Sequence, residues 1–219
     1  MQQIVTDLNF FRYVKRTSKI LGWDVPTHGR IYRSVSTNHI EKSLDVIEEK
    51  VWPWFARNGC PAPNWRKLVT EAVTRIQPLK YDLLDMRNDS RREQIIDILR
   101  PLYQIKNIKS TNYMPCSKVL HFFFPELIIK VDTAWIKNVC FRKLKQEGGY
   151  EFRVSGPVSL EEYDILLKWA ANFDYDFGPY AMAFEWCLLG YCDREIREKK
   201  RCSTTKKGSD WRGAKALIT

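Results

Sequence analysis

Apolar residues recur at intervals of three and four positions along most of this chain, a pattern that predicts amphipathic helices. The first such run lies within residues 4–20. The second lies within residues 40–51, and either Thr37 or Asn38 is placed to cap it. Pro53 is expected to kink or end this second helix, because proline cannot continue helical hydrogen bonding.

The stretch between these two runs lacks the helical period. Residues 22–36 are mostly polar and include Pro26 and Gly29. Both residue types are common in turns and uncommon inside regular elements. We therefore predict a connection here that holds a short strand at most.

Two more helices are expected before the middle of the chain. Asn64 is a candidate N-cap for an apolar face that stops before Pro78. Ser90 and Glu93 have the spacing of a capping box, in which each side chain accepts a hydrogen bond from the other residue's backbone. This pair predicts a helix beginning near residue 90.

The second half of the chain continues the helical pattern. Residues 115–124 form an apolar run that is expected to be helical, and Asp132 is placed to cap the helix that follows. Ser159 and Glu162 predict a second capping box. Pro179 suits the first turn of a last helix.

No strand-turn-strand pattern accompanies these helices, so the predicted fold class is all-α. We expect a single compact helical domain of seven to nine helices over residues 1–199, with room for two lobes and a cleft near residues 105–135. From about residue 200 the apolar period is lost, and residues 200–219 are predicted to be a basic, flexible tail.

The amino-acid composition limits the classes of protein to which this chain can belong. The 219 residues are 44% hydrophobic and 28% charged, as in a globular protein. No apolar run reaches the roughly 20 residues of a membrane helix, and the first residues lack the apolar segment of a secretory signal. We therefore expect a cytoplasmic protein without a membrane partner. The six cysteines include no Cys-x2-Cys pair, so buried thiols are expected, with no metal and no cofactor.

The positive charge is concentrated in two parts of the chain. The net charge is +10. Residues 199–219 hold seven basic residues and one acidic residue, and residues 101–150 hold eight basic and three acidic residues. These segments contribute +6 and +5, which leaves −1 for the rest. Such clustering is typical of a nucleic-acid-binding surface, so DNA is the expected partner, although lysines also serve to solvate a surface.

The most unusual stretch covers residues 108–135. Lys118 begins an apolar helix, and Val131-Asp132-Thr133 stands at the start of the next one. This order resembles the hairpin and catalytic loop of the helix-hairpin-helix DNA glycosylases. The resemblance covers about 30 residues. It implies an enzyme that cleaves the N-glycosidic bond of an altered base, with Asp132 essential and Lys118 in the position of the attacking lysine.

The chemistry of such a site matches these residue types. Cleavage develops positive charge on the sugar, which a carboxylate such as Asp132 stabilises. Apolar neighbours favour a lower pKa of the Lys118 amine, which would make it a nucleophile able to form a Schiff base. Side chains for a base-binding pocket and for DNA contacts lie nearby. The first set is Tyr113, His121, Phe122 and Trp135, and the second is Lys106, Lys109, Ser117, Lys130 and Lys137.

A different hypothesis assigns these residues no chemistry. Asp132 is also a favoured helix cap, Lys118 an ordinary first-turn lysine, and His121 and Phe122 candidates for the core. The chain would then be a non-catalytic helical protein that binds nucleic acid or takes part in a host–phage interaction. The sequence leaves the oligomeric state open.

Overall fold

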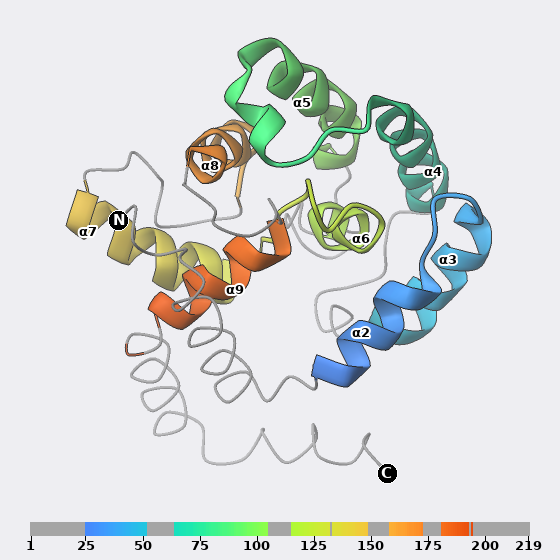
Figure 1. Ribbon diagram of the computed structural model, residues 1–219, viewed down its shortest axis with the longest axis horizontal. Coiled ribbons are helices and arrows are strands. Elements are labelled where there is room, and N and C mark those ends of the chain that lie inside the picture. Colours follow the sequence, from blue (N-terminus) through green and yellow to red (C-terminus); the bar gives the residue numbers. More distant parts are fainter. Residues whose placement is uncertain are drawn as a thin grey trace.

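The structure, a computed structural model, describes residues 25–51, 64–104, 115–131, 133–148, 158–172, 181–192 and 194. Eight α-helices and no strand occur in these segments, which confirms the predicted all-α class (Figure 1). The helices are α2 (Val25–Ser34), α3 (Ile40–Val46), α4 (Trp65–Ile76), α5 (Asp89–Tyr103), α6 (Pro115–Phe123), α7 (Arg142–Gly148), α8 (Leu160–Ala171) and α9 (Ala181–Tyr191). Two π-helical and two 3-10 segments accompany them, η2 (Ile47–Val51), η7 (Thr133–Phe141), η5 (Gln77–Leu79) and η6 (Leu84–Arg87).

Helix α6 lies between the other helices, as Figure 1 shows. It packs against α2 and α4, while α4 packs against α5 and α5 against α8. Helix α9 packs against η7. The buried apolar residues of these elements form one continuous core, with Leu44, Val73, Leu99 and Leu120 fully covered. The helical period seen in the sequence therefore places one apolar face of helices such as α4, α5 and α8 in this core.

The predicted connection over residues 22–36 is wrong, because most of it is helix α2. Pro26 stands in the first turn of that helix, where its missing N–H costs no hydrogen bond. Ile31 is buried in the core, and Tyr32 packs against it. Tertiary packing of these two side chains therefore outweighs the weak local helix signal.

The predicted helix ends are confirmed in part. Ser159 and Glu162 form the capping box that begins α8. The capping box predicted at Ser90 and Glu93 is wrong, because α5 is capped by Asn88. The side-chain oxygen of Asn88 accepts a hydrogen bond from Arg91 N–H at 3.1 Å. Asn64 does precede α4 but makes no side-chain cap bond.

The remaining helix ends follow from the same geometry. Helix α3 begins after His39, which stands at the N-cap position in place of Thr37 or Asn38. Helix α4 ends at Ile76, before Pro78, as predicted. Pro53, Pro179, the first predicted helix over residues 4–20 and the basic tail over residues 200–219 lie outside the described residues.

None of the helices in the described segments has the combined length and apolar character needed to cross a bilayer.

A buried ion pair joins η7 to the start of α8. Lys137 Nζ lies 2.6 Å from Glu162 Oε2, and Lys137 has no exposed surface. The same carboxylate oxygen accepts the Ser159 backbone N–H at 2.9 Å, as part of the capping box. Glu162 therefore neutralises an interior ammonium and satisfies a helix N-terminus at once.

This double role predicts a large loss of stability in Glu162→Gln. Removing one member of a buried ion pair costs about 3–5 kcal/mol, because the other charge stays inside. We expect the free energy of unfolding, measured by urea denaturation, to fall by that amount. Adding Lys137→Met should recover part of the loss.

Glu161→Gln is the matched control, since Glu161 is the exposed neighbour on the same turn. Its free energy of unfolding should change by no more than about 0.5 kcal/mol. Equal losses of unfolding free energy in Glu162→Gln and Glu161→Gln would show that the buried ion pair contributes nothing to stability.

Candidate functional site

The chain leaves the end of α6, turns at residues 125–127 and runs back in a non-helical path toward the beginning of that helix. The turn is closed by backbone hydrogen bonds from Leu127 and Ile128 N–H to Phe124 C=O, at 3.1 and 2.8 Å. Residues 127–131 then pass through the core, and every one of them is buried. This path places Val131 beside Ser117 in the first turn of α6.

The polar backbone groups of this buried run are satisfied by side chains. Ile128 C=O accepts from His121 Nδ1–H at 2.6 Å, and Ile129 C=O accepts from the Tyr163 hydroxyl at 3.1 Å. Val131 N–H donates to Ser117 Oγ at 3.4 Å. Because a buried backbone group without a partner is costly, these side chains fix the path of the run.

The last of these bonds brings two helix starts together. Ser117 immediately precedes Lys118, and Val131 is separated from the start of η7 at Thr133 only by Asp132. Asp132 lies outside the described residues. Lys118 is largely shielded, with 8% of its surface exposed. The residues that immediately precede the two predicted catalytic positions, Ser117 and Val131, are therefore adjacent at one end of α6.

His121 is part of the interior rather than of a base-binding pocket. Its ring is fully buried, and Nε2 lies 2.6 Å from the Tyr32 hydroxyl. A carbonyl only accepts, so in the neutral ring Nδ1 carries the proton and Nε2 accepts from Tyr32. Both ring nitrogens therefore form hydrogen bonds that connect α6 to α2 and to the buried residues 127–131. The predicted substrate-binding role of His121 is corrected accordingly.

Phe122 is likewise a core residue. It is buried, and its ring centroid lies 5.0 Å from that of Tyr32. A ring enclosed in this way offers no face on which a nucleobase could stack. The predicted substrate-binding role of Phe122 is therefore also corrected.

Burial raises the pKa of the Tyr32 hydroxyl, and the negative charges of Glu185 and Glu126 raise it further. Burial also raises the pKa of Tyr163, against the opposing effect of its hydrogen bond to the backbone of Ile129. Both phenols are therefore held in the neutral form that their hydrogen bonds require.

Lys130 and Lys137, predicted to contact DNA phosphates, point into the protein. Lys130 Nζ lies 3.3 Å from Glu185 Oε1 of α9, and both residues are buried. Lys137 is fully buried against Glu162. A lysine in an interior ion pair cannot reach a phosphate at the surface without leaving its carboxylate, so these two predictions are wrong. Ser117 is buried too, and its hydroxyl accepts from Val131.

The other predicted site residues are not tested by the described structure. Trp135 belongs to η7, but its side chain lies outside the described residues. Four predicted residues lie outside them altogether, namely Lys106, Lys109, Tyr113 and Asp132. Within the described segments, no three His, Cys, Asp or Glu side chains are grouped so as to hold a metal ion.

Three residues of the interior polar cluster were not predicted from the sequence, namely Tyr32, Glu185, and Glu162 in its role as an ion-pair partner. A signal existed for Glu185, which is the one charged residue in the eleven residues of α9. A lone carboxylate in an apolar helix indicates a buried partner of opposite charge. Tyr32 lay in a stretch predicted to be a connection and gave no such signal.

Comparisons with known proteins give no match: no family model fits the sequence, and no curated protein or solved structure is significantly similar to it.

The buried phenols predict that the protein loses stability in alkaline solution. A tyrosine whose pKa is raised on folding favours the folded state fully below the unfolded pKa, which is about 10. As the pH rises above that value, the unfolded chain releases the proton and the folded chain keeps it. Each such tyrosine then lowers the free energy of unfolding by about 1.4 kcal/mol per pH unit.

Urea denaturation between pH 7 and 11.5 tests this prediction with Tyr32→Phe. Above about pH 10, the substitution should make the free energy of unfolding fall less steeply with pH. The expected difference is the contribution of one proton, about 1.4 kcal/mol per pH unit. At pH 7 it should cost about 1–3 kcal/mol, because His121 Nε2 loses its donor inside the protein. Tyr81→Phe is the control at pH 7, since the Tyr81 hydroxyl bonds Gln94 at the surface. An unchanged alkaline slope in Tyr32→Phe would contradict the assignment.

Proposed function

We propose that this protein is a DNA-binding enzyme that removes an altered base by cleaving its N-glycosidic bond. The observation that supports the proposal is the hydrogen bond from Val131 N–H to Ser117 Oγ. It holds together the two backbone segments that carry Lys118 and Asp132. In the proposed site these two side chains act on one sugar from neighbouring helix starts.

Each side chain has a distinct role in this proposal. The Asp132 carboxylate stabilises the positive charge that develops on the sugar as the bond to the base breaks. The Lys118 amine attacks the anomeric carbon or positions the adjacent phosphate. The small exposed fraction of Lys118, 8%, supports a position at the wall of a site rather than on the open surface.

The target base must leave the stack before it can be attacked. With His121 and Phe122 committed to the core, the side chains that would line a base pocket are Tyr113 and Trp135. The phosphate contacts that remain in the proposal are Lys106 and Lys109. Trp135 belongs to the π-helical η7, and such segments are frequent at functional sites.

A specific observation favours a second candidate function. Lys130, Lys137, His121 and Ser117 all have structural partners inside the protein. A segment whose polar residues maintain the core fits a non-catalytic, helical nucleic-acid-binding protein equally well. This second candidate also includes a host–phage interaction without DNA binding, and the two candidates differ on base release.

Incubation with duplexes that carry a panel of altered bases separates the two candidates. The enzyme should release one base, detected by mass spectrometry, and leave an abasic site. Asp132→Asn should slow release by roughly 100-fold or more, because the charge that forms on the sugar loses its counterion. Asp97→Asn, an exposed carboxylate on α5, is the control for charge.

Borohydride trapping tests the role of Lys118. A covalent adduct that disappears in Lys118→Gln and persists in Lys145→Gln identifies Lys118 as the attacking amine, since Lys145 is an exposed lysine on α7. Release of the base without an adduct assigns Lys118 to positioning. DNA binding without release from any duplex, or full activity in folded Asp132→Asn, would refute the enzymatic proposal.

A further inference from the structure

The last turn of α9 is bonded to the region where η7 passes into α7. Cys140 Sγ lies 3.9 Å from Leu188 C=O, and Lys143 Nζ donates a hydrogen bond to Tyr191 C=O at 3.1 Å. The Lys143 ammonium also lies 4.2 Å from the centroid of the Tyr191 ring. A positive charge is favourable at the carboxyl end of a helix, because the last carbonyl groups have no partner within the helix. These contacts fix the start of α7 beside the end of α9.

This arrangement brings together the two basic segments of the sequence. Helix α7 belongs to the first of them and holds three basic residues and one acidic residue, a net charge of +2. The chain after α9 leads into the second, and residues 194–201 hold five basic and two acidic residues, a net charge of +3. At about 3.6 Å per residue or less, Arg197 lies within roughly 11 Å of Arg194. Both positive segments therefore adjoin the same end of α9.

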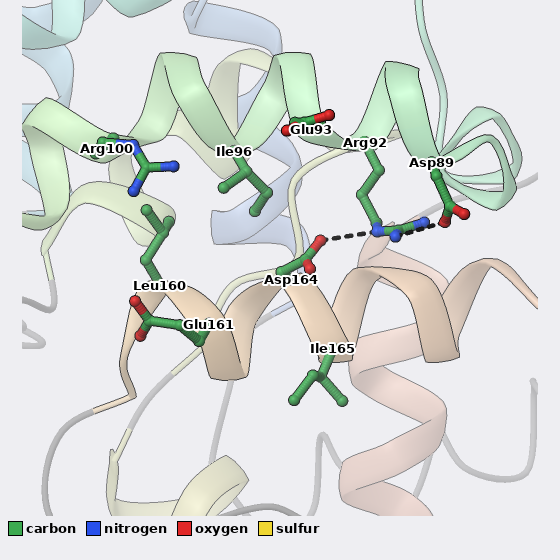
Figure 2. Close-up of a pocket in the computed structure, with 9 residues that line it drawn as sticks. All are labelled: Asp89, Arg92, Glu93, Ile96, Arg100, Leu160, Glu161, Asp164 and Ile165. Carbon is green, nitrogen blue, oxygen red and sulfur yellow. Dashed lines mark hydrogen bonds and ion pairs between the residues drawn. The ribbon is translucent and has the colours of Figure 1, made fainter.

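The charge on the outer face of α7 is not neutralised within the described part of the protein. Arg142 and Lys145 are exposed, and their spacing of three residues places them on one face of the helix. Neither of them takes part in an ion pair with another described residue. Arg92 of α5 shows the contrast, since its guanidinium is held by Asp164 at 2.7 Å and Asp89 at 2.6 Å (Figure 2). The charge of α7 is therefore available to a partner, whereas that of Arg92 is not.

A negatively charged polymer is the partner that such a surface fits. Each phosphate that an exposed lysine or arginine contacts releases a condensed counterion, which favours binding. Arg142 and Lys145 can make such contacts without first leaving a carboxylate, unlike the buried Lys130 and Lys137. Two segments that adjoin one end of α9 also offer phosphates more contacts than either segment alone.

We propose that the exposed face of α7 and the basic residues that follow α9 form one surface that binds the phosphate backbone of duplex DNA. Arg142 and Lys145 contact phosphates from α7, and the basic residues among 194–201 contact them from the other segment. Lys143 positions the two segments, since its contacts with Tyr191 join them. This role rests on the DNA binding of the proposed function and does not depend on removal of a base.

The salt dependence of DNA binding by the full-length protein tests this surface. Fluorescence anisotropy with an unmodified duplex gives the association constant between about 50 and 200 mM salt. Arg142→Gln with Lys145→Gln should make the plot of log association constant against log salt concentration less steep by about 1.8, because each lost phosphate contact removes about 0.9. Circular dichroism verifies that the variant is folded.

Lys42→Gln with Arg75→Gln is the matched control. It removes one exposed lysine and one exposed arginine from α3 and α4, which lie on the opposite side of the molecule from α7 (Figure 1). Its plot should be as steep as that of the unsubstituted protein. Equal steepness in the two double variants would overturn the proposal.

A fourfold variant tests whether both segments hold the same duplex. Adding Lys199→Gln and Arg201→Gln to the α7 substitutions should reduce the steepness by about 3.6 in total, because the lost contacts add when all are made at once. A reduction no larger than that of the α7 variant would show that the residues after α9 take no part, which overturns the single surface.

Base release from altered duplexes, measured separately, distinguishes this surface from the enzymatic proposal. Release of a base together with unchanged steepness in the α7 variant would refute the surface alone. Reduced steepness without release of any base would support the surface and refute the enzyme. A protein that binds no duplex even at about 50 mM salt would refute both.

Discussion

The buried, non-helical run over residues 127–131 is the constraint on which the arrangement of the helices depends. Inside a helix each backbone group finds its partner a few residues away, whereas beyond the local bonds of Leu127 and Ile128 N–H this run relies on side chains from other parts of the fold. His121, Tyr163 and Ser117 supply the missing hydrogen bonds from α6 and α8. The turn before the run also accepts the first N–H groups of α9, from Ala181 to Glu126 and from Met182 to Pro125. Three helices are therefore positioned by one short segment.

The buried ion pairs change how the charge of the protein is interpreted. Lys130 and Lys137 count toward the net charge of residues 101–150, but their fields are cancelled inside the protein by Glu185 and Glu162. Interior pairs of this kind add little net stability, yet separating them is costly, so they fix one arrangement of η7, α8 and α9. The positive field that residues 101–150 present to solvent comes from other basic residues, such as the exposed Arg142 and Lys145.

Most of the fold was predictable because it follows from local periodicity, and the errors have local causes. The box at Ser159 and Glu162 was recognised, since both partners lie within one helical turn. The start of α5 was placed two residues late, because Asn88 competes for the same role as Ser90.

The candidate site was less predictable than the fold. Whether a lysine points inward depends on a carboxylate far away in sequence, as in the pair of Lys137 with Glu162. No spacing rule connects two such positions. A helical hairpin predicts only that the segments near Ser117 and Val131 lie close together. The hydrogen bond from Val131 N–H to Ser117 Oγ, which shows how they contact each other, could not be predicted from the sequence.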